Sequence, residues 1–198
     1  MKERPTPEAA RAALHTMMKE RAFEEREVTL SSGLKSNFYF DSKQVTLDAV
    51  GHVYVGRLIH DAVVAYEERS GHTIGAVGGL TLGADPIASA ASMTSALLDD
   101  PRPAFIVRKE AKGHGTGRYI EGMKHVADGI EVAILEDVVT TGASSLKAVE
   151  RVREAGYVVR LVIGLVDRLE GGRANLEAAD VELVTLFDRS DFLQTTTV

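Results

Sequence analysis

Residues 131–149, which read EVAILEDVVTTGASSLKAV, constrain the fold of this chain more than any other stretch. An apolar run typical of a buried β-strand leads into two adjacent carboxylates, Glu136 and Asp137. A turn rich in hydroxyl groups follows, and apolar residues then recur at three-residue spacing from Ala143 to Val152. The stretch therefore predicts a strand that ends at two acids, a polar turn and an amphipathic helix.

The start of this helix is suited to holding a phosphate group. Its first backbone N–H groups lack partners within the helix and lie at the positive end of the helix dipole. Gly142 allows close approach to the backbone, and hydroxyl donors are supplied by Thr140, Thr141, Ser144 and Ser145. The lysine of a nucleoside triphosphate loop is missing, so the two acids favour a sugar phosphate, whose ribose hydroxyls they would bind. An ordinary strand-to-helix connection capped by Asp137 is the alternative.

Strand-like segments alternate with predicted helices along most of the chain. The predicted strands cover residues 73–77, 105–107, 131–135, 158–166 and 181–187. A first helix is expected from the N-cap Thr6 to about residue 19, and a second over residues 47–66. The second helix is expected to cover the sheet with Val50, Val53, Tyr54, Leu58, Ala62 and Tyr66.

This order of elements predicts an α/β fold, with a mainly parallel sheet flanked by helices and a small N-terminal hood. Because ligand sites in such sheets lie at the carboxyl ends of the strands, the loops after residues 77, 107, 135 and 166 should gather at one edge. The length of 198 residues suits one domain over 1–198, with the hood at about 1–45 and the core at about 46–198.

Amino-acid composition limits the kinds of site and the cellular locations that suit this chain. The chain has no cysteine, which excludes disulfides, thiolate zinc sites and a cysteine nucleophile. A net charge of −6 disfavours a nucleic-acid-binding surface. The N-terminal segment has no continuous apolar core, and glycines interrupt the apolar stretch at 74–98, so no membrane span is expected. The expected location is the cytoplasm.

The order of apolar strand, Glu-Asp, two aliphatic residues, Thr, a small residue and Gly resembles the phosphoribosyl diphosphate signature of the type I phosphoribosyltransferases. That resemblance implies the type I phosphoribosyltransferase fold and a phosphoribosyl diphosphate site at the end of the third predicted strand. The implied binding residues are Glu136, Asp137, Val138, Val139, Thr140, Thr141, Gly142, Ala143 and Ser144.

A predicted hairpin near the N-terminus narrows the resemblance to one branch of that family. Two β-prone runs, 28–30 and 38–40, flank a polar turn at 31–33. The pattern Thr-Leu-x-Ser-Gly-x-x-Ser followed by aromatic residues and Asp41 resembles the orotate phosphoribosyltransferases. That resemblance implies that Tyr39 and Phe40 lie beside the pyrimidine. A purely structural hairpin is the alternative.

Residues 108–118 combine four cations and a histidine with three glycines. A solvated loop or a phosphate-seeking lid would explain this composition. The pattern Arg-Lys-Glu-x-Lys-x-His-Gly resembles the catalytic loop of orotate phosphoribosyltransferases, which implies that phosphoribosyl diphosphate is bound by Arg108, Lys109, Lys112 and His114. The last three would also be catalytic, together with Asp137. In that family the lysine at the Lys109 position reaches the neighbouring subunit's site, which implies a homodimer.

Two further segments bear on the substrates. Arg168 follows a predicted strand and can offer a planar fork to a carboxylate, although a surface ion pair with Asp167 is the alternative. The resemblance implies that Arg168 and Thr140 bind orotate. Some family members have lysine where this chain has Ser31 and Gly83, which leaves diphosphate contacts at those two positions open.

The resemblance implies transfer of a phosphoribosyl group from phosphoribosyl diphosphate to orotate, with Mg²⁺ as the cofactor. The metal would be held mainly by the substrate, with no protein ligand assigned. The alternatives are a phosphoribosyltransferase for a purine, which the hairpin and lid disfavour, and a regulator that binds phosphoribosyl diphosphate without turnover. Such a regulator usually carries a nucleic-acid-binding surface, which the net charge of −6 disfavours.

Overall fold

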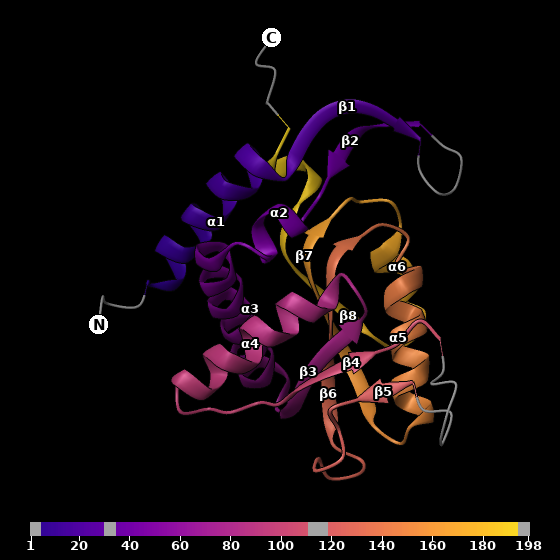
Figure 1. Ribbon diagram of the computed structural model, residues 1–198. Helices are drawn as coiled ribbons and strands as arrows, with labels where there is room; N and C mark the ends of the chain where they lie inside the picture. Colours follow the sequence, from indigo (N-terminus) through magenta and orange to yellow (C-terminus); the bar gives the residue numbers. More distant parts are fainter. Residues whose placement is uncertain (1–4, 30–34, 111–118, 194–198) are drawn as a thin grey trace.

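The computed structural model describes residues 5–29, 35–110 and 119–193. A six-stranded sheet has the order β5-β4-β3-β6-β7-β8, and a separate two-stranded sheet pairs β1 with β2 (Figure 1). Strands β4, β3, β6, β7 and β8 are parallel, and only the edge strand β5 is antiparallel to its neighbour. The strands are β1 (Phe23–Thr29), β2 (Lys35–Phe40), β3 (Ile74–Leu80), β4 (Ala104–Val107), β5 (Ile120–Glu121), β6 (Glu131–Val139), β7 (Val158–Asp167) and β8 (Glu182–Asp188).

Helices cover both faces of the large sheet. Figure 1 shows α3 and α4 on one side of the sheet and α5 and α6 on the other, with α1 packed beside α3. The helices are α1 (Pro7–Arg21), α2 (Lys43–Thr46), α3 (Ala49–Ser70), α4 (Ala84–Leu97), α5 (Ala143–Glu154), α6 (Gly172–Glu177) and the short 3-10 helix η1 (Arg189–Asp191). The predicted α/β class and mainly parallel sheet are therefore confirmed.

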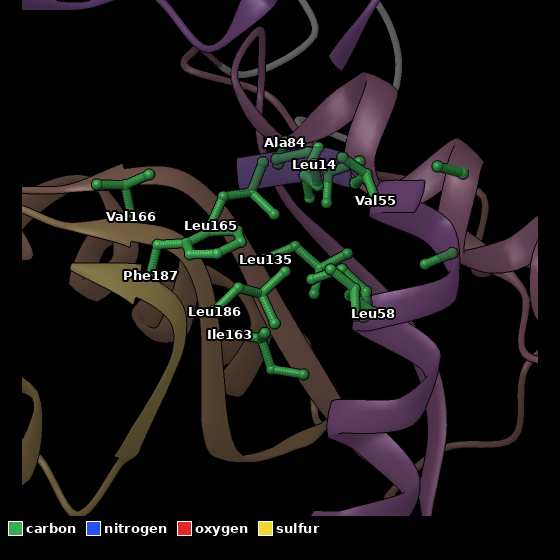
Figure 2. Packing of buried hydrophobic residues seen from close by; sticks show 14 of the residues in the cluster. Leu14, Val55, Leu58, Ala84, Leu135, Ile163, Leu165, Val166, Leu186 and Phe187 are labelled. Carbon is green, nitrogen blue, oxygen red and sulfur yellow. The ribbon is translucent and has the colours of Figure 1, made fainter. Parts of the chain in front are cut away.

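Two hydrophobic cores lie on the two faces of the sheet. In β6, Ala133 and Leu135 pack with the α1, α3 and α4 core, while Val132 and Ile134 pack with the α5 core. This alternation follows from the two-residue period of a strand that is buried on both faces. Figure 2 shows Leu135 among the buried side chains of the first core.

Local sequence signals explain how two long helices begin. The Thr6 side chain accepts a hydrogen bond from the backbone N–H of Ala9 at 3.3 Å and caps α1, as predicted. Asp48 caps α3 by accepting from the backbone of Val50 and Gly51 at 2.9 and 3.0 Å. The second helix therefore begins two residues later than expected, at the point where Asp48 satisfies its first N–H groups.

The expected inward face of the second helix is partly wrong. Val50 and Val53 are 53% and 43% exposed, whereas Val55, Ile59 and Val63 are buried. The helix carries two apolar stripes, and spacing alone does not say which one meets the core. The core takes the second stripe and most of the predicted face as well, because Leu58 and Tyr66 are also buried. Only Val50 and Val53, near the start of the helix, stay on the surface.

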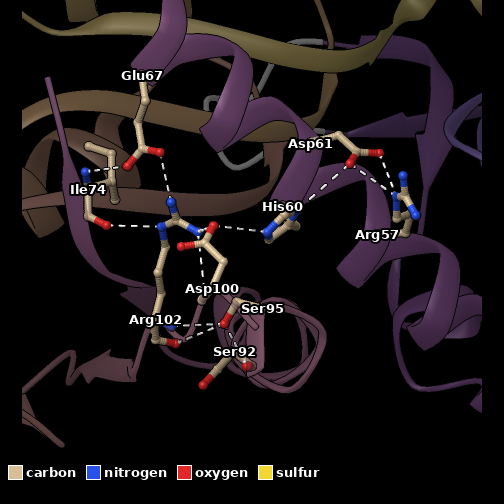
Figure 3. A network of polar contacts seen from close by, with 9 residues as sticks. All are labelled: Arg57, His60, Asp61, Glu67, Ile74, Ser92, Ser95, Asp100 and Arg102. Atoms are coloured by element: carbon tan, nitrogen blue, oxygen red, sulfur yellow. Dashed lines mark hydrogen bonds and ion pairs between the residues drawn. The ribbon is translucent and has the colours of Figure 1, made fainter. Parts of the chain in front are cut away.

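An arginine-centred network fixes the amino-terminal end of β3, away from the strand ends that carry the predicted loops. Arg102 is 8% exposed, and its guanidinium donates to the Ile74 carbonyl at 3.0 Å and to Glu67 at 2.7 Å (Figure 3). The second Glu67 oxygen accepts from the Ile74 backbone N–H at 2.7 Å. Helix α3, strand β3 and the α4–β4 connection are thereby joined by charge-assisted hydrogen bonds.

In the part of the chain that the structure describes, no helix is both long and apolar enough to cross a membrane.

Candidate active site

Loops from four parallel strands meet at one edge of the large sheet. Strands β3, β4, β6 and β7 run in the same direction, so their carboxyl ends lie together. The β1–β2 hairpin lies beyond this edge (Figure 1). The predicted convergence of the loops is confirmed.

Strand β6 continues beyond the two acids, contrary to the sequence-based expectation. Val138 pairs with Val166 and Val139 pairs with Asp167, so the strand ends at Val139. These partners belong to β7, which is far away in the sequence, so local patterning does not reveal the extension. Glu136 and Asp137 are therefore held in a strand rather than in a turn.

The N-cap residue of helix α5 is Gly142, which has a φ of +77°. A Cβ atom at this position would lie 3.2 Å from the carbonyl oxygen of Gly172. The preceding turn is held by Asn175, whose side chain donates to the Thr141 carbonyl at 2.9 Å. No side chain caps α5. The alternative in which Asp137 is the helix cap is thus wrong, and the first turn of α5 keeps its N–H groups for another acceptor.

The Glu136 carboxylate faces the start of α5 and is only 6% exposed. Its Oε2 atom accepts hydrogen bonds from the hydroxyl groups of Ser144 and Ser145, at 2.6 and 2.9 Å. Burial raises the pKa of Glu136 to about 7, and the neighbouring charge of Asp137 also raises it, while the two serine hydrogen bonds lower it. Glu136 therefore sits where it can exchange a proton near neutral pH.

The Asp137 carboxylate is held from three directions. Its Oδ1 atom accepts from the backbone N–H of Val138 at 2.9 Å, and its Oδ2 atom accepts from the Ser42 hydroxyl at 2.6 Å. On the third side, a Cβ atom at Gly83 would lie only 2.5 Å from Oδ1. A side chain at position 83, such as the lysine of some relatives, would therefore require the Asp137 carboxylate to shift.

Arg168 follows β7 and is also buried, with 8% exposure. Its backbone N–H donates to the Val139 carbonyl at 2.9 Å, which brings Arg168 beside the turn that begins at Thr140. The guanidinium pairs with Glu170 at 3.0 Å and lies 5.5 Å from the centre of the Phe38 ring. Arg168 is thus a buried residue paired with Glu170, and the alternative of a surface ion pair with Asp167 is wrong.

Comparison with known proteins gives the family. No family model matched the chain. The orotate phosphoribosyltransferase of Sorangium cellulosum is 48% identical over 183 residues, which cover 92% of this chain and 93% of that protein. The chain belongs to the orotate phosphoribosyltransferase family.

Solved structures of this family share the fold. The orotate phosphoribosyltransferase of Mycobacterium tuberculosis in complex with Fe(III) dicitrate has a TM-score of 0.79 and 34% identity, covering 93% of this chain and 99% of that chain. The same protein in complex with 5-phospho-alpha-D-ribosyl 1-diphosphate has a TM-score of 0.72 and 32% identity, with 92% and 98% covered. The predicted type I phosphoribosyltransferase fold is thus confirmed.

The two aromatic residues that the family resemblance assigns to orotate lie on opposite faces of the hairpin. Phe40 packs on Phe192, with ring centres 5.1 Å apart, whereas Tyr39 carries the Arg26 guanidinium 4.0 Å above its ring. Adjacent residues of a strand point to opposite faces, so one of the two is directed away from any shared ligand. The aromatic ring that the structure brings near Arg168 belongs to Phe38, which was not singled out in the sequence.

The cationic segment expected of an orotate phosphoribosyltransferase is described only at its start. Arg108 pairs with Glu121 at 3.1 Å, and Arg151 of α5 donates to the carbonyl oxygens of Arg108 and Lys109. Lys112 and His114 lie outside the described residues, as does Ser31.

Ser42 and Ser145 are site residues that the sequence analysis did not assign to the acids. Ser145 lies among the hydroxyls expected to face a phosphate, but it is fully buried against Glu136. Ser42 has no local signal of its own, because its partner is 95 positions away.

The described residues contain no cluster of three or more acidic, histidine or cysteine side chains that could hold a metal ion by itself.

Proposed function

We propose that this protein transfers the phosphoribosyl group from 5-phosphoribosyl 1-diphosphate to orotate, giving orotidine 5′-monophosphate and diphosphate for UMP synthesis. The observation that carries the proposal is the joint placement of Asp137, the uncapped start of α5 and Arg168 at one sheet edge. A relative with 32% identity has been solved with the same diphosphate substrate.

In the proposed binding mode, α5, the two acids and Arg168 each bind a different group of the two substrates. The turn from Thr140 and the first N–H groups of α5 hold the 5′-phosphate. Glu136 and Asp137 bind the ribose hydroxyls, and Arg168 pairs with the orotate carboxylate. In the structure the Arg168 guanidinium forms an ion pair with Glu170 at 3.0 Å. Orotate therefore has to displace the Glu170 carboxylate or bind to the guanidinium beside it.

The proposed reaction breaks the bond from C1 of the ribose to the diphosphate, which leaves with the bonding electrons, and then joins C1 to a ring nitrogen of orotate, whose proton passes to the departing diphosphate or to water. The sugar carries positive charge between these two events, and no side chain has to act as a nucleophile. Asp137 lies in the ribose region and stabilises that charge, so catalysis depends on position and electrostatics.

Departure of the diphosphate is assisted by the cations that begin at Arg108, together with Lys109, Lys112 and His114. When bound, Mg²⁺ would add positive charge beside the diphosphate. Closure of this cationic segment over the site would exclude water and limit hydrolysis of the activated sugar.

The proposed assembly is a homodimer in which Lys109 acts in the partner's site. Its support is the exposure of apolar side chains on two helices that pack together: Val50 and Val53 of α3 are 53% and 43% exposed, and Met93 and Leu97 of α4 are 47% and 54% exposed. Exposed apolar side chains of this size are typical of surfaces that become buried between subunits. The proposed location is the cytoplasm, which fits a chain without cysteine.

The proposal is tested by mixing the protein with orotate, phosphoribosyl diphosphate and Mg²⁺ and following the loss of orotate absorbance. Turnover with orotate and none with adenine, guanine or hypoxanthine is the expected result. Turnover only with a purine would support the purine enzyme instead, and binding of phosphoribosyl diphosphate without any turnover would support the regulator.

A further inference from the structure

Ser42 occupies the position of a helix cap but does not act as one. It is the N-cap residue of α2, where a serine hydroxyl ordinarily accepts a hydrogen bond from its own helix. Here the Ser42 side chain makes no capping hydrogen bond. At the start of α2 it is the Asp41 side chain that accepts hydrogen bonds, from the backbone N–H of Lys43 at 3.3 Å and from the side chain of Gln44 at 3.0 Å. The hydroxyl of Ser42 is therefore released from its usual local role.

That hydroxyl is directed at the acid of the active site. Ser42 is 1% exposed, and its Oγ atom donates to Oδ2 of Asp137 at 2.6 Å. A hydrogen bond from a buried hydroxyl to a carboxylate is short and strong, and its direction is fixed by the surrounding packing. The other carboxylate oxygen is bound by the Val138 N–H, and Gly83 closes a third side. The orientation of the Asp137 carboxylate consequently depends on Ser42.

We propose that Ser42 is a positioning residue, which holds the Asp137 carboxylate in the orientation that the ribose of the substrate requires. Ser42 follows β2 by two residues, so the same contact ties the hairpin that carries Tyr39 and Phe40 to the acid at the end of β6. This inference rests on the proposed role of Asp137.

Replacement of Ser42 by alanine removes one of the two hydrogen bonds that orient the Asp137 carboxylate and leaves Oδ2 without its donor. We expect Ser42→Ala to lower kcat about tenfold to a hundredfold, because small errors in the position of a group at the reacting centre have effects of this size. The KM for orotate should stay within about twofold, since Ser42 acts through the acid and not through the base. Ser42→Thr, which keeps the hydroxyl, should recover most of the lost kcat.

A matched control is Ser95, which is 2% exposed and hydrogen-bonded to the Arg102 backbone at 2.9 Å in the network of Figure 3. Ser95→Ala should lower the melting temperature without lowering kcat. If Ser42→Ala behaves in the same way, Ser42 is only structural and the inference is overturned. If Ser42→Ala does not fold, Ser42→Cys provides the test, because it is similar in size but a weak donor; a wild-type kcat for that variant overturns the inference.

A double-mutant cycle separates this inference from the proposed role of Asp137. In Asp137→Asn, the further change Ser42→Ala should alter the dissociation constant of phosphoribosyl diphosphate much less than it does in the wild-type background. Equal effects in both backgrounds would mean that Ser42 does not act through Asp137. Full activity of Asp137→Asn itself would instead overturn the proposed role of the acid, and the inference with it.

Discussion

At the scale of single residues, the raised pKa of Glu136 couples the site to stability. The unfolded carboxyl loses its proton near pH 4.5, and the folded one loses it near 7 because burial disfavours the charge. Between these values the folded state binds more protons, so stability decreases as pH rises from about 4.5 to about 7. Above about pH 7, the buried charge of Glu136 therefore lowers the free energy of unfolding.

We predict that Glu136→Gln raises the free energy of unfolding by about 2 kcal/mol at pH 8 and leaves it nearly unchanged at pH 5, because the amide carries no charge to bury. Chemical denaturation at the two pH values measures the difference, and turnover should be lost. Glu150→Gln on the exposed side of α5 is the control and should show no such difference. An equal effect of Glu136→Gln at both pH values would contradict the prediction.

At the scale of elements, α5 holds both ends of the segment that carries the cations proposed to be catalytic. The Arg151 guanidinium donates to the Lys109 carbonyl at 2.9 Å and lies 4.0 Å over the Tyr119 ring. The Arg108 backbone N–H in turn donates to the Tyr119 carbonyl at 2.8 Å. The start of α5 is also the proposed phosphate site. The same helix therefore fixes the distance between the bound phosphate and the cations.

We predict that Arg151→Ala lowers kcat about tenfold, because Arg108 and Lys109 lose their common anchor. Arg151→Lys should recover only part of this loss, since lysine lacks the planar fork. Arg153→Ala is the matched control on the same helix: Arg153 donates to the Ala179 and Val159 carbonyls, so its loss should lower stability and not kcat. Steady-state kinetics and thermal melting separate the two variants, and an unchanged kcat for Arg151→Ala would refute the role of the anchor.

At the scale of the whole molecule, the proposed dimer predicts shared active sites. Lys109→Ala and Asp137→Ala should each be inactive as pure proteins. When the two are mixed and allowed to exchange subunits, some activity should return, because one site of a mixed dimer contains both an intact Asp137 and an intact Lys109. Subunit exchange is verified with a tagged copy. No recovery after verified exchange would mean that Lys109 does not act in the partner's site.

The α/β class, the five parallel strands and the gathering of four loops at one edge could all be predicted from the sequence, whereas the edge strand β5 and the short helices α2 and α6 could not. Each depends on a local period or on the direction of parallel strands. The residues that surround Glu136 and Asp137 could not be predicted in the same way. Ser145 was expected to face a phosphate and instead donates a hydrogen bond to Glu136, because it lies on the buried side of α5.

By itself, the sequence determined the succession of strand, acids, hydroxyl-rich segment and helix at 131–149, since neighbouring residues encode it, although not the end of the strand at Val139. Only the tertiary structure decided that Ser42 holds Asp137, that Gly83 closes against the same carboxylate, and that Val50 stays on the surface. Hydrogen bonds and steric contacts between distant segments leave no periodic signal in the chain. They depend on how the hairpin, the helices and the sheet pack together, and that packing sets the geometry of the acids.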